Sequence, residues 1–192
     1  VEDGKDNNYA ISADFQDYIK NGIGIDPATI NAIVFANNDY DNEMLSALFD
    51  KLKQLDSSSS TDFIDDISNP SGTSTRYNYN GVNYYVGSAQ RSLWIMPESE
   101  NDTYFTSGLA LASSAGSGLF HNMTNLTYVV FQNLDTSVAV DMSGMFAGCT
   151  KLKMIQIVNG SFNTSNVTDM SGMFEGCENL ELIDYVYSSE EF

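Results

Sequence analysis

The amino-acid sequence predicts an α+β N-terminal capping region followed by a short α/β solenoid with a small parallel sheet. The main observation is a repeat: Asp141-Met-Ser-Gly-Met-Phe146 returns as Asp169-Met-Ser-Gly-Met-Phe174, 28 residues later. The pair Gly148-Cys149 returns at the same offset as Gly176-Cys177. A fixed period of this length is typical of units that are too small to bury an apolar face alone and therefore stack on one another. Upstream of residue 101 the chain instead mixes helix-type and strand-type patterns.

Composition bounds the class of protein. The chain has 192 residues, of which 42% are hydrophobic and 12% aromatic, enough to form a core and to exclude global disorder. Its 26 acidic and 8 basic residues give a net charge of −18. This balance argues against binding to nucleic acid or anionic membranes, because phosphate contacts require Lys or Arg. No run approaches the roughly 18 apolar residues of a membrane span, so direct membrane insertion is not expected.

The α+β capping region is expected over residues 9–100. It follows a polar stretch at 1–8, of the kind that remains when a signal peptide is removed, which suggests an extracellular location. Ser12 is a suitable N-cap for a helix over Ala13–Lys20. Asp26-Pro27 opens a brief turn with proline in the first helical position. The apolar run Ile30–Ala36 predicts a strand.

The rest of the capping region is expected to hold a second helix and an antiparallel meander. The helix is placed at Glu43–Leu55, where Asn42 can cap it and the apolar residues form one stripe. Asp56–Asp66 contains four consecutive serines and is expected to be a loop. Asn80-Gly81 is a strong hairpin signal, since a type I′ turn requires positive φ at both central residues. The meander strands are expected at Thr75–Tyr79, Val82–Val86 and Arg91–Met96.

The repeat region, residues 101–192, is expected to contain about 2.5–3 units. Three copies align on Phe120, Phe146 and Phe174, and each leads to a leucine that opens a segment of the form L-x-x-φ-x-φ, where φ is apolar. This form is typical of leucine-rich repeats. The expected strands are Leu126–Phe131, Leu152–Ile157 and Leu180–Tyr185. Between strands, the helical spacing of Val167, Met170, Met173 and Phe174 predicts a short amphipathic helix.

The segment from Asn163 to Leu180, NTSNVTDMSGMFEGCENL, closely resembles the repeat of bacterial BspA-like leucine-rich repeat surface proteins, a group that includes the repeated lipoprotein-type family. Residues 135–152 are a more diverged copy, and Met123 stands where the later copies have cysteine. The resemblance covers residues 119–185. It implies a protein exported to the bacterial surface, an adhesin or interaction module, whose repeat carries no catalytic residues.

Alternation along the expected strands assigns one face to the core and the other to an open face of the sheet. The expected core positions are Leu126, Val129, Phe131, Leu152, Ile155, Ile157, Leu180, Ile183 and Tyr185. The candidate binding residues on the open face are Tyr128, Val130, Lys153, Met154, Gln156, Glu181, Leu182 and Asp184. The row Tyr128, Met154, Leu182 is apolar although it is expected to be exposed. Such a row marks an interaction surface, unless another part of the chain covers it.

Three other features are open to more than one interpretation. Cys149 and Cys177 occupy equivalent positions in successive units, and packing as free thiols is favoured over a disulfide or a metal site. Asn37–Glu43 is rich in oxygen ligands but lacks the glycine and distant glutamate of a calcium loop, so a helix cap is favoured. His121, the only histidine, has no evident nucleophile or orienting partner. We therefore expect no enzyme activity, no metal and no cofactor.

The sequence thus predicts a non-catalytic bacterial cell-surface interaction module that binds a protein or a glycan of a host, matrix or neighbouring cell. The alternative is a structural stalk or cap segment of a larger envelope protein, without a ligand of its own. A third hypothesis is an enzyme or a carbohydrate-processing accessory protein. Stacking of the repeats also predicts that Phe146→Ala or Phe174→Ala would cost roughly 3–5 kcal/mol of stability.

Overall fold

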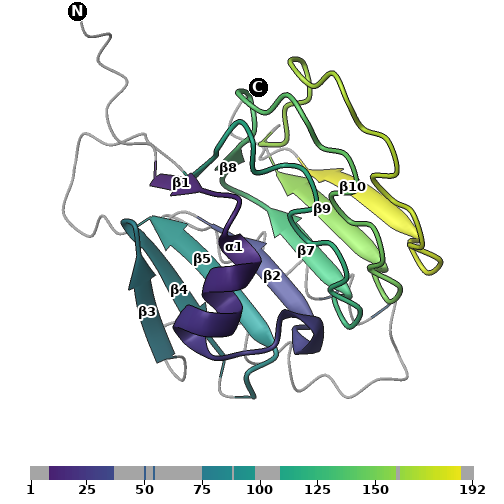
Figure 1. Ribbon diagram of the computed structural model, residues 1–192. Helices are drawn as coiled ribbons and strands as arrows, with labels where there is room; N and C mark the ends of the chain where they lie inside the picture. Colours follow the sequence, from purple (N-terminus) through teal and green to yellow (C-terminus); the bar gives the residue numbers. More distant parts are fainter. Residues whose placement is uncertain are drawn as a thin grey trace, which may run out of the picture.

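The computed structural model describes residues 9–36, 50, 54, 75–87, 89–97, 109–158 and 161–186. Its larger sheet comprises β2 (Ala32–Phe35), β3 (Thr75–Tyr79), β4 (Val82–Val86), β5 (Ser92–Pro97), β7 (Tyr128–Phe131), β9 (Met154–Val158) and β10 (Leu182–Val186). These seven strands are arranged in the order β10-β9-β7-β2-β5-β4-β3 (Figure 1). A smaller parallel sheet comprises β1 (Tyr9–Ile11), β6 (Leu109–Leu111) and β8 (Leu134–Asp135).

The expected fold class, an α+β cap followed by an α/β solenoid, is wrong. Strand β2 lies between β5 and β7 and pairs in parallel with both, so that Val34 faces Trp94 on one side and Val130 on the other. Strands from residues 9–100 and from residues 101–192 therefore share one mixed sheet. The physical reason is that all four residues of β2 are buried, and a short apolar strand of this kind is stable only with neighbours on both edges and cover on both faces.

The N-terminal helix is less regular than expected and lies slightly further along the chain than Ala13–Lys20. Helix α1 spans Phe15–Asp17 and continues as a π-helical turn, η1, over Tyr18–Ile23. It ends at Gly24, whose φ of 89° is in the left-handed region. Ser12 does not cap the helix, because its hydroxyl instead donates to the Asp14 carboxylate.

Two turns expected from the sequence are confirmed. The 3-10 turn η2 (Pro27–Thr29) begins at Asp26, whose Oδ1 accepts a 3.0 Å hydrogen bond from the N–H of Ala28. The β3–β4 hairpin has positive φ at Asn80 (52°) and Gly81 (75°), as a type I′ turn requires.

The short helix expected between the repeated strands is also wrong. Residues 142–148 and 170–176 form successive turns rather than a helix. Gly144 and Gly172 adopt φ values of 60° and 61°, and an α-helix cannot continue through a left-handed residue. Of the four residues expected to form the apolar face of that helix, Met173 is buried, Val167 is half-buried, and Met170 and Phe174 are exposed. Their equivalents one copy earlier, Met142, Met145 and Phe146, are buried in the turns.

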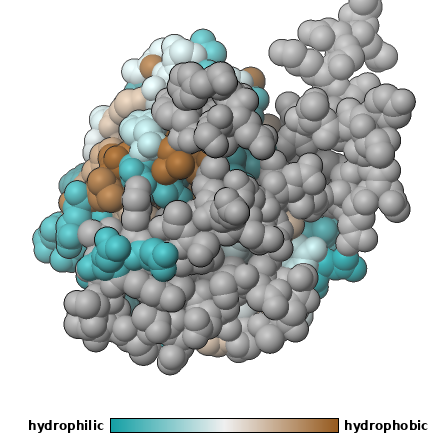
Figure 2. Space-filling view, turned by 180° about the vertical axis from the view of Figure 1, so that it is seen from behind, coloured by the Kyte–Doolittle hydropathy of each residue, from teal (hydrophilic) through white to brown (hydrophobic). Residues whose placement is uncertain are grey.

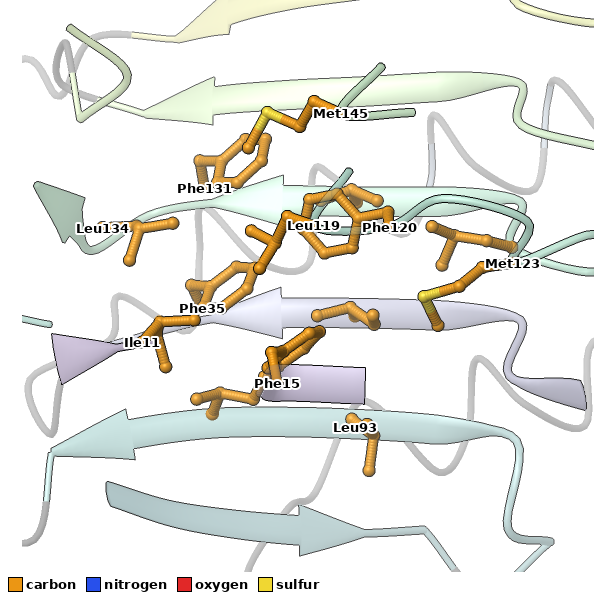
Figure 3. Packing of buried hydrophobic residues seen from close by; sticks show 14 of the residues in the cluster. Ile11, Phe15, Phe35, Leu93, Leu119, Phe120, Met123, Phe131, Leu134 and Met145 are labelled. Atoms are coloured by element: carbon orange, nitrogen blue, oxygen red, sulfur yellow. The ribbon is translucent and has the colours of Figure 1, made fainter. Parts of the chain in front are cut away.

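The central strands of the large sheet are buried on both faces. The face over which α1 and the turns lie carries the larger cluster, the first core, in which Phe15 and Phe35 meet Phe120 and Phe131 (Figure 3). The opposite face carries a smaller cluster, the second core. Its buried members are Ala32, Val34, Ala36, Trp94, Met96, Tyr128, Val130 and Met154. The repeated strands β7 and β9 therefore contribute side chains to both cores.

Several expectations lie outside the described residues. They are the polar leader at 1–8, nearly all of the helix Glu43–Leu55, the loop Asp56–Asp66 and the oxygen-rich segment Asn37–Glu43.

Candidate functional site

The residues expected to form an open binding face do lie together, but most of them are not open. The strands pair in the expected register, which places Tyr128 beside Met154 and Met154 beside Leu182. Four of the residues are buried, namely Tyr128, Val130, Met154 and Gln156. Lys153, Leu182 and Asp184 are half-buried and Glu181 is exposed. The expected exposure of this row is therefore wrong, and since the structure holds a single chain, the chain itself covers it.

A continuous hydrogen-bond ladder joins the turns on the other side of the first core. We call residues 116–122, 142–148 and 170–176 the turn ribbon. Each segment donates N–H groups to carbonyl groups of the next segment along the chain. The donor–acceptor pairs between the last two segments are Met142–Asp169, Gly144–Ser171, Phe146–Met173 and Gly148–Glu175, at 2.8 to 2.9 Å. The first two segments repeat the pattern with Gly118–Ser143, Phe120–Met145 and Asn122–Ala147.

The ladder has a direction, so its two ends differ chemically. All these bonds run from an earlier donor to a later acceptor. In the last segment, the equivalent N–H groups are those of Met170, Gly172, Phe174 and Gly176. They point away from the stack. No described residue accepts a hydrogen bond from any of these four N–H groups. The C-terminal end of the turn ribbon is thus a row of donors at two-residue spacing.

The opposite end of the turn ribbon exposes carbonyl groups, and α1 covers them. The carboxamide of Gln16 donates through Nε2 to the carbonyl oxygens of Leu119 and His121, each at 3.0 Å. These carbonyls correspond to those of Met145 and Ala147, which accept bonds from the first segment. Gln16 therefore closes the acceptor end of the ladder, a role that the sequence analysis did not identify.

We expect Gln16→Leu to lower the free energy of unfolding by about 1–2 kcal/mol, because two backbone acceptors lose their donor. Gln16→Glu should cost more, since its carboxylate would face the same two carbonyl oxygens. Urea denaturation followed by circular dichroism measures both effects. The matched control is Lys20→Leu, a change at an exposed residue close by in η1. Equal losses for Gln16→Leu and Lys20→Leu would show that the carboxamide does not cap the ladder.

An aromatic column runs through the stack and reaches its surface at the donor end. Phe146 stacks on Phe120 with ring centroids 5.0 Å apart, and Phe174 stacks on Phe146 at 5.5 Å with an angle of 5° between the rings. Phe146 is buried, whereas Phe174 is 38% exposed. The loss of about 3–5 kcal/mol of stability expected for substitution by alanine therefore applies to Phe146 but is too large for Phe174.

The last unit leaves further apolar side chains at the surface. Met170 is 42% exposed, Ile183 40% and Tyr185 59%. Ile183 and Tyr185 pair with Ile155 and Ile157, which are buried in the first core. We call the surface formed by Met170, Phe174, Ile183, Tyr185 and the edge of β10 that pairs with no other described strand the open end. These four residues were expected to lie in the core or on the apolar face of a helix, but no other described residue covers them fully.

The open end is acidic at its rim. Residues 161–186 contain no Lys or Arg. They contain five carboxylates, those of Asp169, Glu175, Glu178, Glu181 and Asp184. Seen from behind, the side of the molecule on which β10 lies shows hydrophobic and hydrophilic surface next to each other (Figure 2). The open end therefore combines an apolar centre, negative charge and unpaired backbone groups.

The two cysteines act as hydrogen-bond donors between units. Both are free thiols. Each Sγ donates to the carbonyl of a phenylalanine in the preceding unit, Cys149 to Phe120 and Cys177 to Phe146, both at 3.1 Å. Burial, together with the neighbouring Cys177 thiol, raises the pKa of Cys149 from 9.0 to about 12. A thiol of this kind is protonated at neutral pH and has the character of a core residue rather than a nucleophile.

This raised pKa predicts a pH-dependent stability. Below about pH 9 Cys149 is protonated in the folded and unfolded chains and contributes no pH dependence. Between about pH 9 and 12 the unfolded chain releases the proton that the folded chain retains. The free energy of unfolding should therefore fall by up to about 1.4 kcal/mol per pH unit from this residue. Urea melts of wild type and Cys149→Ala across this range measure the difference; parallel pH curves would contradict the prediction.

His121 lies at the acceptor end of the ladder, where its carbonyl binds Gln16. Within the described ranges no group of three or more His, Cys, Asp or Glu side chains could hold a metal ion. In the same part of the chain, no helix has the length and apolar character needed to cross a membrane.

One comparison with known proteins gives a match. Residues 115–186 match a family model described as "Mycoplasma protein of unknown function, DUF285". The matched region includes the turn ribbon and β7 to β10, so the similarity concerns the stacked units and not the whole chain. No curated protein and no solved structure matches the chain.

Proposed function

We propose that this chain is a non-catalytic interaction module of the bacterial cell surface, and that it binds a host or matrix partner through the open end. The observation that carries the proposal is the cluster of four exposed apolar side chains beside the unpaired edge of β10. Clustered exposed apolar residues with a polar rim are typical of interaction sites. An unpaired strand edge adds backbone groups that a partner can bind.

Display at the cell surface rests on two further points. The net charge of −18 favours a soluble, well-hydrated exterior and disfavours nucleic acid as a partner. The resemblance of residues 163–180 to the repeats of bacterial surface proteins supports export.

A structural role in a larger envelope protein is the second candidate. The same open end offers the donor row and the apolar side chains to which one more unit of the repeat would bind. The two candidates differ in what occupies the open end in the cell, an external partner or a polypeptide of the envelope itself.

Binding to immobilised host cells and matrix proteins tests the proposal. Phe174→Ser/Tyr185→Ser should reduce binding by at least about tenfold, equivalent to about 1.4 kcal/mol, because the open end loses its aromatic surface. The matched control is Val138→Ser/Val140→Ser, which removes two side chains that are 55% and 47% exposed in the preceding unit. Thermal melts confirm that both variants fold. Equal binding by the two variants would refute a role for the open end.

A further inference from the structure

The direction of the hydrogen-bond ladder restricts what can occupy the open end. Its turn-ribbon side presents a row of N–H groups, those of Met170, Gly172, Phe174 and Gly176. The carbonyl groups of Met170, Gly172 and Phe174 accept bonds within the same segment, from Met173, Glu175 and Cys177. An occupant must therefore bring acceptors to this side.

A second copy of the chain is disfavoured by charge. In a two-fold dimer the open end of one copy meets the open end of the other. The five carboxylates of one copy would face those of the second, with no Lys or Arg among residues 161–186 to offset them. A head-to-tail dimer requires the carbonyl end of the ladder, which Gln16 and α1 already cover.

The strand side of the open end fits an extended polypeptide. Among the strands that the structure describes, β10 is the last of the sheet and pairs with β9. A strand added to this edge would place alternate side chains on the two faces of the sheet. Those on the side of the first core would cover Ile183, Tyr185 and Phe174, and those on the other side would lie near Asp184.

Charge selects among extended polypeptides. Apolar side chains are required over the exposed centre of the open end. Cationic side chains are favoured at the rim because two carboxylates lie there. Asp184 is in β10, and Glu181 immediately precedes it. Lys or Arg opposite these groups also speeds association at low ionic strength.

We infer that the open end binds an extended, cationic polypeptide segment with alternating apolar and basic residues, which adds to the edge of β10. The inference rests on the proposed function and specifies its partner class. Ile183 and Tyr185 make the apolar contacts with this peptide. The carboxylates of the rim give the preference for basic residues.

Two synthetic peptides test the inference. One alternates Val with Lys, the other Val with Glu, and both carry a fluorophore for anisotropy measurements. The wild-type chain should bind the Val/Lys peptide at least about tenfold more tightly than the Val/Glu peptide, and the preference should shrink at high salt. Ile183→Lys/Tyr185→Lys should abolish binding of the Val/Lys peptide. Val138→Lys/Val140→Lys, which adds the same charge at the preceding unit, should retain most of it.

Three outcomes would overturn the inference. The first is equal affinity for the two peptides. The second is equal loss in the two Lys variants. The third is a wild-type dimer in sedimentation experiments together with a monomeric Tyr185→Lys variant. That result would make a second copy the occupant of the open end. If the peptides fail while host binding still depends on Phe174 and Tyr185, the proposed function stands and only the partner class is wrong. If neither assay depends on these residues, both proposals fail.

Discussion

Phe146→Ala is expected to lower the free energy of unfolding by about 3–5 kcal/mol, a large part of the stability of a typical domain. The Phe146 ring is buried and lies in the middle of the aromatic column, between Phe120 and Phe174. It also meets the edge of Phe131, whose ring centroid is 6.4 Å away. Its removal would leave a cavity where the turn ribbon packs against β7.

The matched control for this prediction is Phe174→Ala. The two residues are equivalent in the repeat, but Phe174 is 38% exposed and has a phenylalanine neighbour on one side only. Its loss should cost about 1–2 kcal/mol. Urea denaturation monitored by circular dichroism gives both values. Similar costs at the two positions would mean that the stack does not end where the structure places its open end.

Phe35→Ala is expected to lower the free energy of unfolding by a similar amount, about 3–5 kcal/mol. All parts of the sheet should then unfold in one cooperative transition. Phe35 is fully buried in β2 and stacks on Phe131 of β7, with centroids 5.6 Å apart and an angle of 5°. It also contacts Phe15 of α1 at 6.2 Å. The ring thus links the N-terminal strands to the repeated units.

Two probes in different parts of the chain test this second prediction. Trp94, the only tryptophan, reports on β5 by fluorescence, and thiol labelling of buried Cys149 reports on the repeated units. In Phe35→Ala both should change at the same, lower urea concentration. Tyr77→Ala, at the edge strand β3, is the control and should cost about 1 kcal/mol because its side chain is half-buried. Loss of the Trp94 signal while Cys149 stays protected would show two independent units.

The local features of the sequence predicted local structure well. Asn80-Gly81 predicted the hairpin because few residues adopt positive φ, and Asp26-Pro27 predicted the η2 turn for similar stereochemical reasons. The repeat predicted the pairing of Ile155 with Ile183, since an in-register stack follows from equal spacing.

Long-range placement could not be predicted in the same way. Nothing within the run Ile30–Ala36 specifies that β2 pairs with β7, almost a hundred positions later, and this pairing decides the fold class. The apolar spacing around Met170 fits a helix as well as a series of turns, and Gly172 decides between them through its φ. Alternation correctly grouped Tyr128 with Met154, but burial of that face depends on tertiary packing that a strand pattern does not contain.

The cap at Gln16 was missed for a related reason. A glutamine near the N-terminus carries no sequence signal of its own, and its two acceptors, Leu119 and His121, are more than a hundred residues away. What the repeat does imply is that a stack of equivalent units has two different ends. The structure shows that one end is closed by α1 and that the other leaves apolar side chains exposed.

Amide hydrogen exchange tests this polarity most directly. The N–H groups of Met142, Gly144, Phe146 and Gly148 donate to the next unit, whereas no described residue accepts from their equivalents Met170, Gly172, Phe174 and Gly176. The first four amides should exchange slowly and the second four rapidly. Addition of the Val/Lys peptide should slow exchange in β10. Equal protection of the two sets in the free chain would contradict a stack that is closed at one end and open at the other.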